Sequence, residues 1–345
     1  MRKFLFKTGV YTGLLLIISC VVIYAGILIA PQFFLGTYAP DFFSVGYQYT
    51  QIESELPYRN IVVGDSRGSA AVDPTMLNNN WINLSIPGSD FFEGFITLKK
   101  YLGKNKIDTL VMVYGAQFIE GKSPFFSQRT IPFRFVGKDD LKNLEQIEKK
   151  QQGQFHGNMF LGGRTGAVKL AMNQFDRRLS YIRFPLEYRA TFWDAFETYT
   201  TSYAKIEEKI NVRMQQIKTT RGHICFGNAD SMNAVADSSV DRAFVHDRIE
   251  LEYLDSIMNI AGRNNISCYL IIAPINEATY KVYEGHKYFQ SMDDFLCGLS
   301  QKYPRLKITK QGYMPDSSFG DDLHLNERGC KAFTLQLQDK LHRAD

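Results

Sequence analysis

The chain has 345 residues, of which 45% are hydrophobic, 22% charged and 14% aromatic. This composition is typical of a folded globular protein and excludes a disordered or fibrous one. The net charge is only +4, and basic residues are scattered among acidic ones, so the basic stripe that neutralises a nucleic-acid backbone is missing. We therefore expect no nucleic acid as a partner.

The N-terminal region predicts a membrane anchor. Residues 8–30 carry no charge, and about 20 apolar residues suffice to cross the hydrocarbon core of a bilayer. Arg2, Lys3 and Lys7 precede this stretch, so the positive-inside rule places the short N-terminus in the cytoplasm. Residues 1–30 are thus expected to form a cytoplasmic tip and a single-pass anchor in the cell membrane. The C-terminal domain would be extracytoplasmic, in the periplasm or at the cell surface.

Two other interpretations of this region are less favoured. A cleaved signal peptide has an apolar stretch of about 7–15 residues and a small-residue cleavage site, whereas this stretch is longer and runs into Pro31. Residues 17–20 resemble a bacterial lipoprotein processing box, but such a box is followed by polar residues. Here Cys20 is followed by Val-Val-Ile-Tyr, so we expect the apolar stretch to be retained as an anchor.

Four cysteines follow the anchor: Cys225, Cys268, Cys297 and Cys330. An oxidising exterior would permit two disulfides, with the pairing left open. Free thiols are the simpler interpretation, because Cys268 lies in an apolar stretch where a buried thiol is ordinary. No Cys-x-x-Cys or Cys/His spacing indicates a metal site, and neither a metal nor another cofactor is expected.

The rest of the chain predicts one folded domain with an insertion. Residues 31–57 are aromatic, contain Pro40 and Pro57, and are interpreted as a juxtamembrane linker rather than part of a periodic element. The domain is expected at residues 58–345, with an insertion at residues 120–245. The insertion is expected to form a helical subdomain over the site, because a structureless loop of that length is rare inside a compact domain.

Within the insertion, two charged stretches have helical character, at residues 138–152 and 203–217. Between them lie a Gly-rich turn at residues 162–163 and an aromatic patch at residues 184–199. No motif identifies the insertion, but an apolar cover of this kind over a site would exclude water.

Outside the insertion, short apolar stretches alternate with helical patterns. Five stretches predict buried strands, at residues 59–64, 81–85, 107–114, 266–273 and 305–309. Apolar residues at helical spacing predict helices at residues 91–102, 247–263, 290–301 and 326–342. This alternation indicates an α/β fold, a three-layer parallel sheet with helices on both faces. Ligands of such sheets bind beyond the carboxyl ends of the strands.

A candidate nucleophile follows the first predicted strand, in Gly64-Asp65-Ser66. A tight turn there lifts a hydroxyl out of the sheet and aims the following backbone N–H groups at an oxyanion. The tripeptide alone is weak evidence, because Asp65 or Ser66 is as well explained as the N-cap of the next helix.

A candidate base lies near the C-terminus, in Asp321-Asp322-Leu323-His324 before the last predicted helix. Asp321 is spaced to orient the imidazole of His324 and to stabilise its charge, which leaves the other ring nitrogen free to take the serine proton. The alternative is a helix cap or a solvated turn.

Other candidates are weaker. Arg67 could bind a carboxylate or phosphate, but an exposed arginine at the helix start is the simpler interpretation. Four other histidines are interpreted as surface residues: His156, His223, His246 and His286. Of these, His223 or His246 could reach the site from the insertion.

Together the two motifs resemble the SGNH (GDSL-type) hydrolase superfamily. Its serine lies in a Gly-Asp-Ser motif after the first strand, and its histidine lies in a late Asp-x-x-His. The resemblance covers residues 58–345 without the insertion. It implies a flavodoxin-like three-layer fold and a catalytic triad of Ser66, His324 and Asp321.

The same resemblance implies an oxyanion hole. In the superfamily its donors are the serine, a glycine after the next strand and an asparagine in a Gly-x-Asn context after the following strand. These positions correspond to Ser66, Gly88 and Gln117. Gln117, in Gly115-Ala116-Gln117, departs from the family's asparagine, which puts the efficiency of the oxyanion hole in doubt.

The anchor and the resemblance suggest a class of function. A membrane-tethered chain with a domain of this kind resembles the proteins that add or remove acyl groups on bacterial cell-surface polymers. We expect an O-acyltransferase that forms an acyl-Ser66 intermediate and transfers the acyl group to a surface polysaccharide or related polymer. Its expected partners are the membrane, this acceptor polymer and, as a candidate, a multi-pass membrane acyltransferase. A carbohydrate or lipid esterase is the second interpretation. A non-catalytic polymer-binding or assembly module is the third, supported only by the departure at Gln117.

Overall fold

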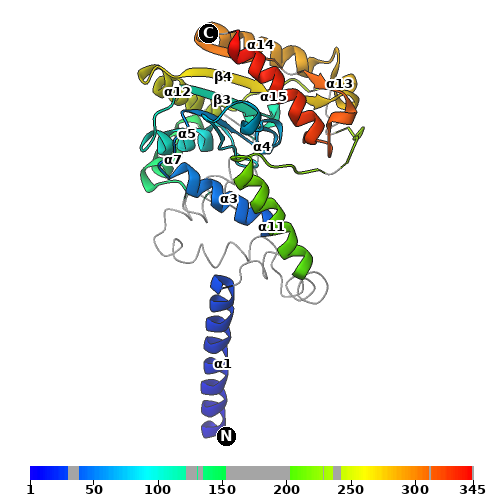
Figure 1. Cartoon of the computed structure of the whole chain (residues 1–345). Helices are drawn as coiled ribbons and strands as arrows, with labels where there is room; N and C mark the ends of the chain where they lie inside the picture. The colour runs from blue at the N-terminus through cyan, green and yellow to red at the C-terminus, as the bar shows by residue number, and fades with distance from the viewer. Residues whose placement is uncertain are drawn as a thin grey trace.

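The computed structural model shows a long N-terminal helix standing away from a domain in which a sheet lies between helices (Figure 1). It describes residues 1–29, 39–121, 130, 135–152, 203–227, 229–235, 242–310 and 312–343. The predicted Gly-rich turn at residues 162–163 and the aromatic patch at residues 184–199 lie outside these described residues.

The N-terminal helix α1 runs over Arg2–Ile29. Its segment Arg2–Val22 is long and apolar enough to cross a membrane, with a mean hydropathy of 1.9. None of that segment is buried against the rest of the protein, whereas the core helix of a soluble domain would be mostly covered. The predicted apolar N-terminal helix is thus present, and its length, composition and exposure make it a candidate membrane span.

Five parallel strands form the central sheet in the order β2-β1-β3-β4-β6. They are β1 (Asn60–Gly64), β2 (Trp81–Asn83), β3 (Thr109–Tyr114), β4 (Ser267–Ile272) and β6 (Leu306–Thr309). All five predicted strands are present. A separate parallel pair, β5 (Ile275–Asn276) with β7 (Tyr313–Met314), was not predicted, because strands of that length show no periodicity. The strand order changes direction between β1 and β3, which is where open sheets of this kind bind ligands.

Helices cover both faces of the sheet. One face carries α5 (Phe91–Leu102), α12 (Arg248–Arg263) and α14 (Lys287–Lys302), and the other carries α4 (Ser66–Ala71) and α15 (Glu327–His342). Each strand serves both layers by alternation, since Ile61 and Val63 lie in the first core and Val62 lies in the second. The predicted three-layer α/β class is confirmed. The remaining elements are α6 (Ala116–Ile119), α7 (Lys138–Gln152), α11 (Tyr203–Thr219), α13 (Glu277–Tyr283) and the 3₁₀ turns η2 (Pro74–Met76) and η4 (Asp316–Ser318).

Residues 31–57, interpreted from sequence as a linker, contain a helix instead. α3 runs over Ala39–Ile52, and its side chains Val45, Tyr49 and Ile52 are buried in the main core. Proline is favoured in the first turn of a helix, so Pro40 marks the beginning of α3 rather than a linker. The linker prediction is therefore wrong for this stretch, and the packed part of the chain begins before residue 58.

α3 and the turn at Arg221 and Gly222, just after α11, lie against the outer edge of β2. The side-chain amide of Gln48 donates to the carbonyl oxygens of Asn83 at 2.9 Å and Ser85 at 3.3 Å. The N–H of Asn83 donates to the carbonyl of Arg221 at 2.9 Å, and Gly222 (φ +106) lies so close to Asn83 that a Cβ would collide with its carbonyl. An edge strand that is satisfied in this way offers no template for pairing with another chain.

The five cysteines all lie in described segments and are free thiols, the interpretation that the sequence favoured. Cys268 and Cys330 are buried, and burial raises the pKa of each thiol to about 12. Both are therefore protonated packing residues at neutral pH rather than reactive ones.

Replacement of Ile52 by alanine should destabilise the domain. Ile52 is fully buried in the core, and truncation of such a side chain lowers the free energy of unfolding by about 2–5 kcal/mol. Thr50→Ala, on the exposed side of the same helix, is the matched control and should change it by less than about 0.5 kcal/mol. Denaturant unfolding of the detergent-solubilised chain measures both. Equal free energies of unfolding for the two variants would contradict the packing of α3 into the core.

Candidate active site

Ser66 opens α4 directly after β1, and its neighbour Asp65 is the N-cap of that helix. The Asp65 carboxylate accepts hydrogen bonds from the N–H groups of Arg67 at 2.8 Å and Gly68 at 3.3 Å. Its second oxygen accepts from the N–H of Gly115, at the end of β3, at 2.9 Å. The ambiguity in the sequence is thereby resolved: Asp65 caps the helix, and the hydroxyl of Ser66 is left for another partner.

Two glycines let this turn lie unusually close to β3. A Cβ on Gly64 would collide with the carbonyl oxygen of Val113. A Cβ on Gly68 would lie 2.9 Å from the same oxygen and 2.8 Å from the hydroxyl of Ser85. Because neither glycine carries a side chain, α4 starts directly against the carboxyl end of the sheet, and Ser66 comes to lie at that edge.

His324 lies within hydrogen-bonding distance of both predicted partners. Its Nε2 is 2.7 Å from the Oγ of Ser66, and its Nδ1 is 2.8 Å from Oδ2 of Asp321. Asp321 also accepts the backbone N–H groups of Leu323 and His324, at 2.9 and 2.7 Å. The predicted contacts are confirmed, across 258 positions of sequence between Ser66 and His324.

The environment of Asp321 favours its charged form. Burial raises its pKa, but the hydrogen bond from His324, the charge of His324 and two backbone N–H donors outweigh burial, and the pKa lies below the ordinary value. An ionised Asp321 at neutral pH holds the proton of His324 on Nδ1, which makes Nε2 an acceptor for the Ser66 hydroxyl. The arrangement is therefore able to draw a proton from Ser66.

The three predicted oxyanion positions follow three adjacent strands at one edge of the sheet. Ser66 follows β1, Gly88 lies in the buried turn after β2 with φ +73, and Gln117 lies in α6 after β3. The side-chain oxygen of Gln117 is 2.7 Å from the point that a Cβ on Gly115 would occupy. The predicted placement is confirmed, while the role of these groups as oxyanion donors stays a prediction.

Phe226 covers the ring of His324 and was missed from sequence. The two rings are stacked, with centroids 4.6 Å apart and planes at 28°. The guanidinium of Arg213 also lies over the Phe226 ring, with Cζ 4.9 Å from the ring centroid. Nη1 of Arg213 forms an ion pair with Oδ1 of Asp41 in α3, at 3.2 Å. A lone phenylalanine in a polar loop carries no sequence signal that would pair it with a histidine near the other end of the domain.

The segment that carries Phe226 is fastened to the loop that carries His324. The N–H of Ala229 donates to the carbonyl of Gly320 at 3.1 Å, and the N–H of Met232 donates to the carbonyl of Asp316 at 3.0 Å. The N–H of Ile224 donates to the carbonyl of Ser69 in α4. The segment from Ile224 to Met232 thus contacts both α4 and the loop that carries His324.

Two residues that the sequence placed on the surface are buried. Arg67 is 7% exposed and His223 is 4% exposed, so the surface interpretation is wrong for both. Nε2 of His223 lies 3.2 Å from the carbonyl oxygen of Ala70 in α4, and burial lowers the pKa of this histidine. His223 is thus a packing residue under the helix that begins with Ser66.

His246 is half-buried and stacks on Phe295, and His156 lies outside the described residues.

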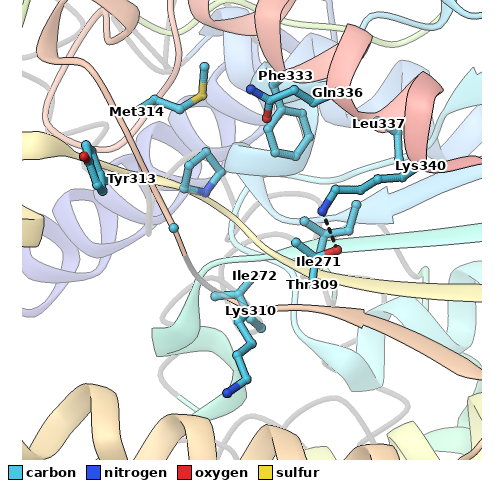
Figure 2. Close-up of a pocket in the computed structure, with 12 residues that line it drawn as sticks. Ile271, Ile272, Thr309, Lys310, Tyr313, Met314, Phe333, Gln336, Leu337 and Lys340 are labelled. Carbon is cyan, nitrogen blue, oxygen red and sulfur yellow. Dashed lines mark hydrogen bonds between the residues drawn. The ribbon is translucent and has the colours of Figure 1, made fainter.

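A separate small cavity lies where α15 covers the ends of β4 and β6 (Figure 2). Its volume is about 110 Å³, below the roughly 300–1,000 Å³ of typical ligand pockets. At its mouth Nζ of Lys340 donates to Oγ1 of Thr309 at 3.0 Å. No member of the Ser66 site lines it, and its size assigns it no ligand.

No family model and no curated protein matches the chain. Within the part of the chain that the structure describes, no cluster of three or more His, Cys, Asp or Glu side chains could hold a metal ion.

Removal of the Phe226 ring should slow the reaction of Ser66 with a serine-directed fluorophosphonate. An aromatic pair contributes about 0.5–1.5 kcal/mol, so Phe226→Ala should lower the labelling rate by about three- to tenfold as the His324 ring loses its fixed orientation. Phe226→Tyr keeps the stack and should label at nearly the original rate.

Phe289→Ala is the matched control, because Phe289 is also partly buried and stacks on a neighbouring ring, that of Tyr283. It should leave the labelling rate unchanged. A rate for Phe226→Ala equal to that of the Phe289 variant would contradict a positioning role for Phe226.

Proposed function

We propose that the chain is a membrane-anchored serine enzyme that transfers an acyl group to a hydroxyl of a cell-surface polysaccharide or related polymer. The observation that carries the proposal is the hydrogen-bonded series Ser66, His324 and Asp321, with distances of 2.7 and 2.8 Å. A serine hydroxyl is a weak nucleophile until an adjacent base takes its proton. His324 is placed to be that base, and Asp321 to orient it.

In the proposed first step, Ser66 Oγ forms a bond to the acyl carbonyl carbon while Nε2 of His324 takes the hydroxyl proton. The carbonyl electron pair moves onto oxygen, beside the N–H groups of Ser66 and Gly88 and the amide of Gln117. The tetrahedral intermediate then re-forms the carbonyl and breaks the bond to the leaving oxygen of the donor, which takes the proton from His324. The product is an acyl-Ser66 intermediate.

In the second step a hydroxyl of the acceptor gives its proton to His324 and attacks the acyl carbon, and Ser66 leaves with the proton returned. Water in place of the acceptor would make the same site an esterase. Transfer is favoured because Phe226 covers one face of the His324 ring and the His324 side chain is only 14% exposed. We propose that the inserted region, as a subdomain, limits access of water to the acyl-enzyme.

The fold is proposed to be that of the SGNH superfamily. Support comes from the strand order β2-β1-β3-β4-β6 and from the position of Ser66 and Gly88 after β1 and β2. The departure of Gln117 from asparagine favours the rival in which the chain is a non-catalytic module that binds or assembles the polymer.

The orientation in the membrane is proposed from the basic residues before α1, Arg2, Lys3 and Lys7. A reporter that is active only in the cytoplasm should be inactive when fused after residue 345, and a reporter active only outside should be active there. The reverse pattern would place the domain in the cytoplasm and remove surface polymers from the candidate substrates.

Ser66→Ala should abolish both fluorophosphonate labelling and acylation of the surface polymer, because an enzyme without its nucleophile keeps only the effects of binding and of the oxyanion hole. His324→Ala should lower acylation by more than about a thousandfold, and Asp321→Asn by up to about ten-thousandfold through the wrong histidine tautomer. Base-released acyl groups, measured on the polymer of cells that carry each variant, give the readout.

Ser256→Ala is the matched control, since the hydroxyl of Ser256 on α12 donates within its own helix, to the carbonyl of Glu252 at 2.9 Å. It should leave acylation unchanged. Full polymer acylation in cells with Ser66→Ala, together with no fluorophosphonate labelling of Ser66 in the parent chain, would instead favour the non-catalytic module. The same full acylation with a labelled Ser66 in the parent chain would favour the esterase.

A further inference from the structure

Arg67 is a buried cation beside the candidate nucleophile. It follows Ser66 directly in α4, and only 7% of it is exposed. Its Nε has no hydrogen-bond partner among the described residues. A buried charge is costly unless its donors are satisfied, so a guanidinium in this position calls for an acceptor that the described residues do not provide for Nε.

The guanidinium lies at the carboxyl end of β3, over Gly115. Its Nη1 and Cζ are 2.6 and 2.9 Å from the point that a Cβ on Gly115 would occupy. The side-chain oxygen of Gln117 is 2.7 Å from the same point. Gly115 thus leaves the space that the guanidinium fills. Arg67 and Gln117 converge where the strand order changes direction, next to Ser66.

The carboxylate whose charge acts most strongly on Arg67 is already engaged. Asp65 is fully buried and accepts three backbone N–H groups, those of Arg67, Gly68 and Gly115. Burial lowers the pKa of Arg67, and the charge of Asp65 is the largest effect that raises it. Smaller effects in the same direction come from Tyr288, Asp322 and Asp321. Asp65 therefore offsets the charge of Arg67 while its oxygens accept backbone N–H groups, and Nε of the guanidinium fork still lacks an acceptor among the described residues.

We propose that Arg67 forms an anion subsite beside Ser66 that binds a negatively charged oxygen of the substrate. This inference rests on the proposed function for its biological role, but not for the binding itself. The oxygen has two candidate sources with the same chemistry: the oxyanion that forms when Ser66 attacks a carbonyl, or a carboxylate carried by the acyl donor or the polymer. In the first case Arg67 supplies the donor that the family's asparagine supplies elsewhere.

The binding is tested without turnover, in the full chain with Ser66→Ala. Sodium acetate should raise its thermal unfolding temperature relative to sodium chloride of equal ionic strength, because a ligand that binds only the folded state stabilises it. Adding Arg67→Met should remove the acetate effect. Arg67→Lys keeps a cation for Asp65, so it preserves the fold, but it lacks the fork and should need at least tenfold more acetate for the same shift.

Arg59→Gln is the matched control. Arg59 precedes β1 at the opposite end of the strand, where its exposed guanidinium bonds Asp108 at 2.6 Å, and this variant should keep the full acetate effect. No acetate effect in the parent, or an equal effect with arginine and lysine at position 67, overturns the subsite.

Kinetics of the chain with Ser66 intact distinguish the two sources. If Arg67 binds the oxyanion, Arg67→Lys should lower kcat for the neutral ester p-nitrophenyl acetate about a hundred- to a thousandfold with KM little changed. If it binds a substrate carboxylate, the neutral ester should be unaffected and KM should rise for a succinate half-ester. Unchanged kinetics with both esters overturns the subsite.

Fluorophosphonate labelling of Ser66 separates this inference from the proposed function. Labelled Ser66 without an acetate effect leaves the enzyme standing and removes the subsite. An Arg67-dependent acetate effect without labelling or turnover leaves the subsite standing and removes the serine enzyme.

Discussion

The buried carboxylate of Asp65 is the constraint on which the site depends. Its two oxygens connect the start of α4 to the end of β3, through the N–H groups of Arg67, Gly68 and Gly115. Burial raises the pKa of this carboxyl, while the charge of Arg67 and the three backbone N–H donors that converge on it act in the opposite direction. These three hydrogen bonds hold the turn with Ser66 at the point where the strand order changes direction, and every other group of the site is placed relative to that turn.

The fold was predictable because its signals are local. Apolar stretches of strand length and amphipathic helical stretches alternate along the chain, and a parallel sheet buries both faces of each strand. The site motifs were predictable for the same reason, since Gly64-Asp65-Ser66 and Asp321-x-x-His324 are each a few residues long. That Ser66 and His324 meet followed only from the resemblance, and their separation of 2.7 Å is a property of the tertiary structure.

What the sequence missed depends on contacts between distant segments. Nothing in a lone Phe226 shows that it stacks on His324, and nothing in Arg67 shows that Gly115 leaves space for its guanidinium. α3 was missed for a different reason: its proline lies in the first turn, where it favours a helix, but prolines elsewhere end helices. Its burial also depends on α11, against which it packs, and α11 is far away in sequence.

Because α3 packs into the core of the domain, only the residues between α1 and α3 set the greatest distance between the end of α1 and the domain. Residues 30–38 join Ile29 of α1 to Ala39 of α3, and at roughly 3.5 Å per residue they reach at most about 35 Å. With α1 in a bilayer, the domain would search a thin layer along the membrane, where a short tether keeps the local concentration of the site high. Under the proposed function, a long polymer would be modified near its point of emergence, and the distribution of acyl groups along it would record the time each unit spent within reach of the tether.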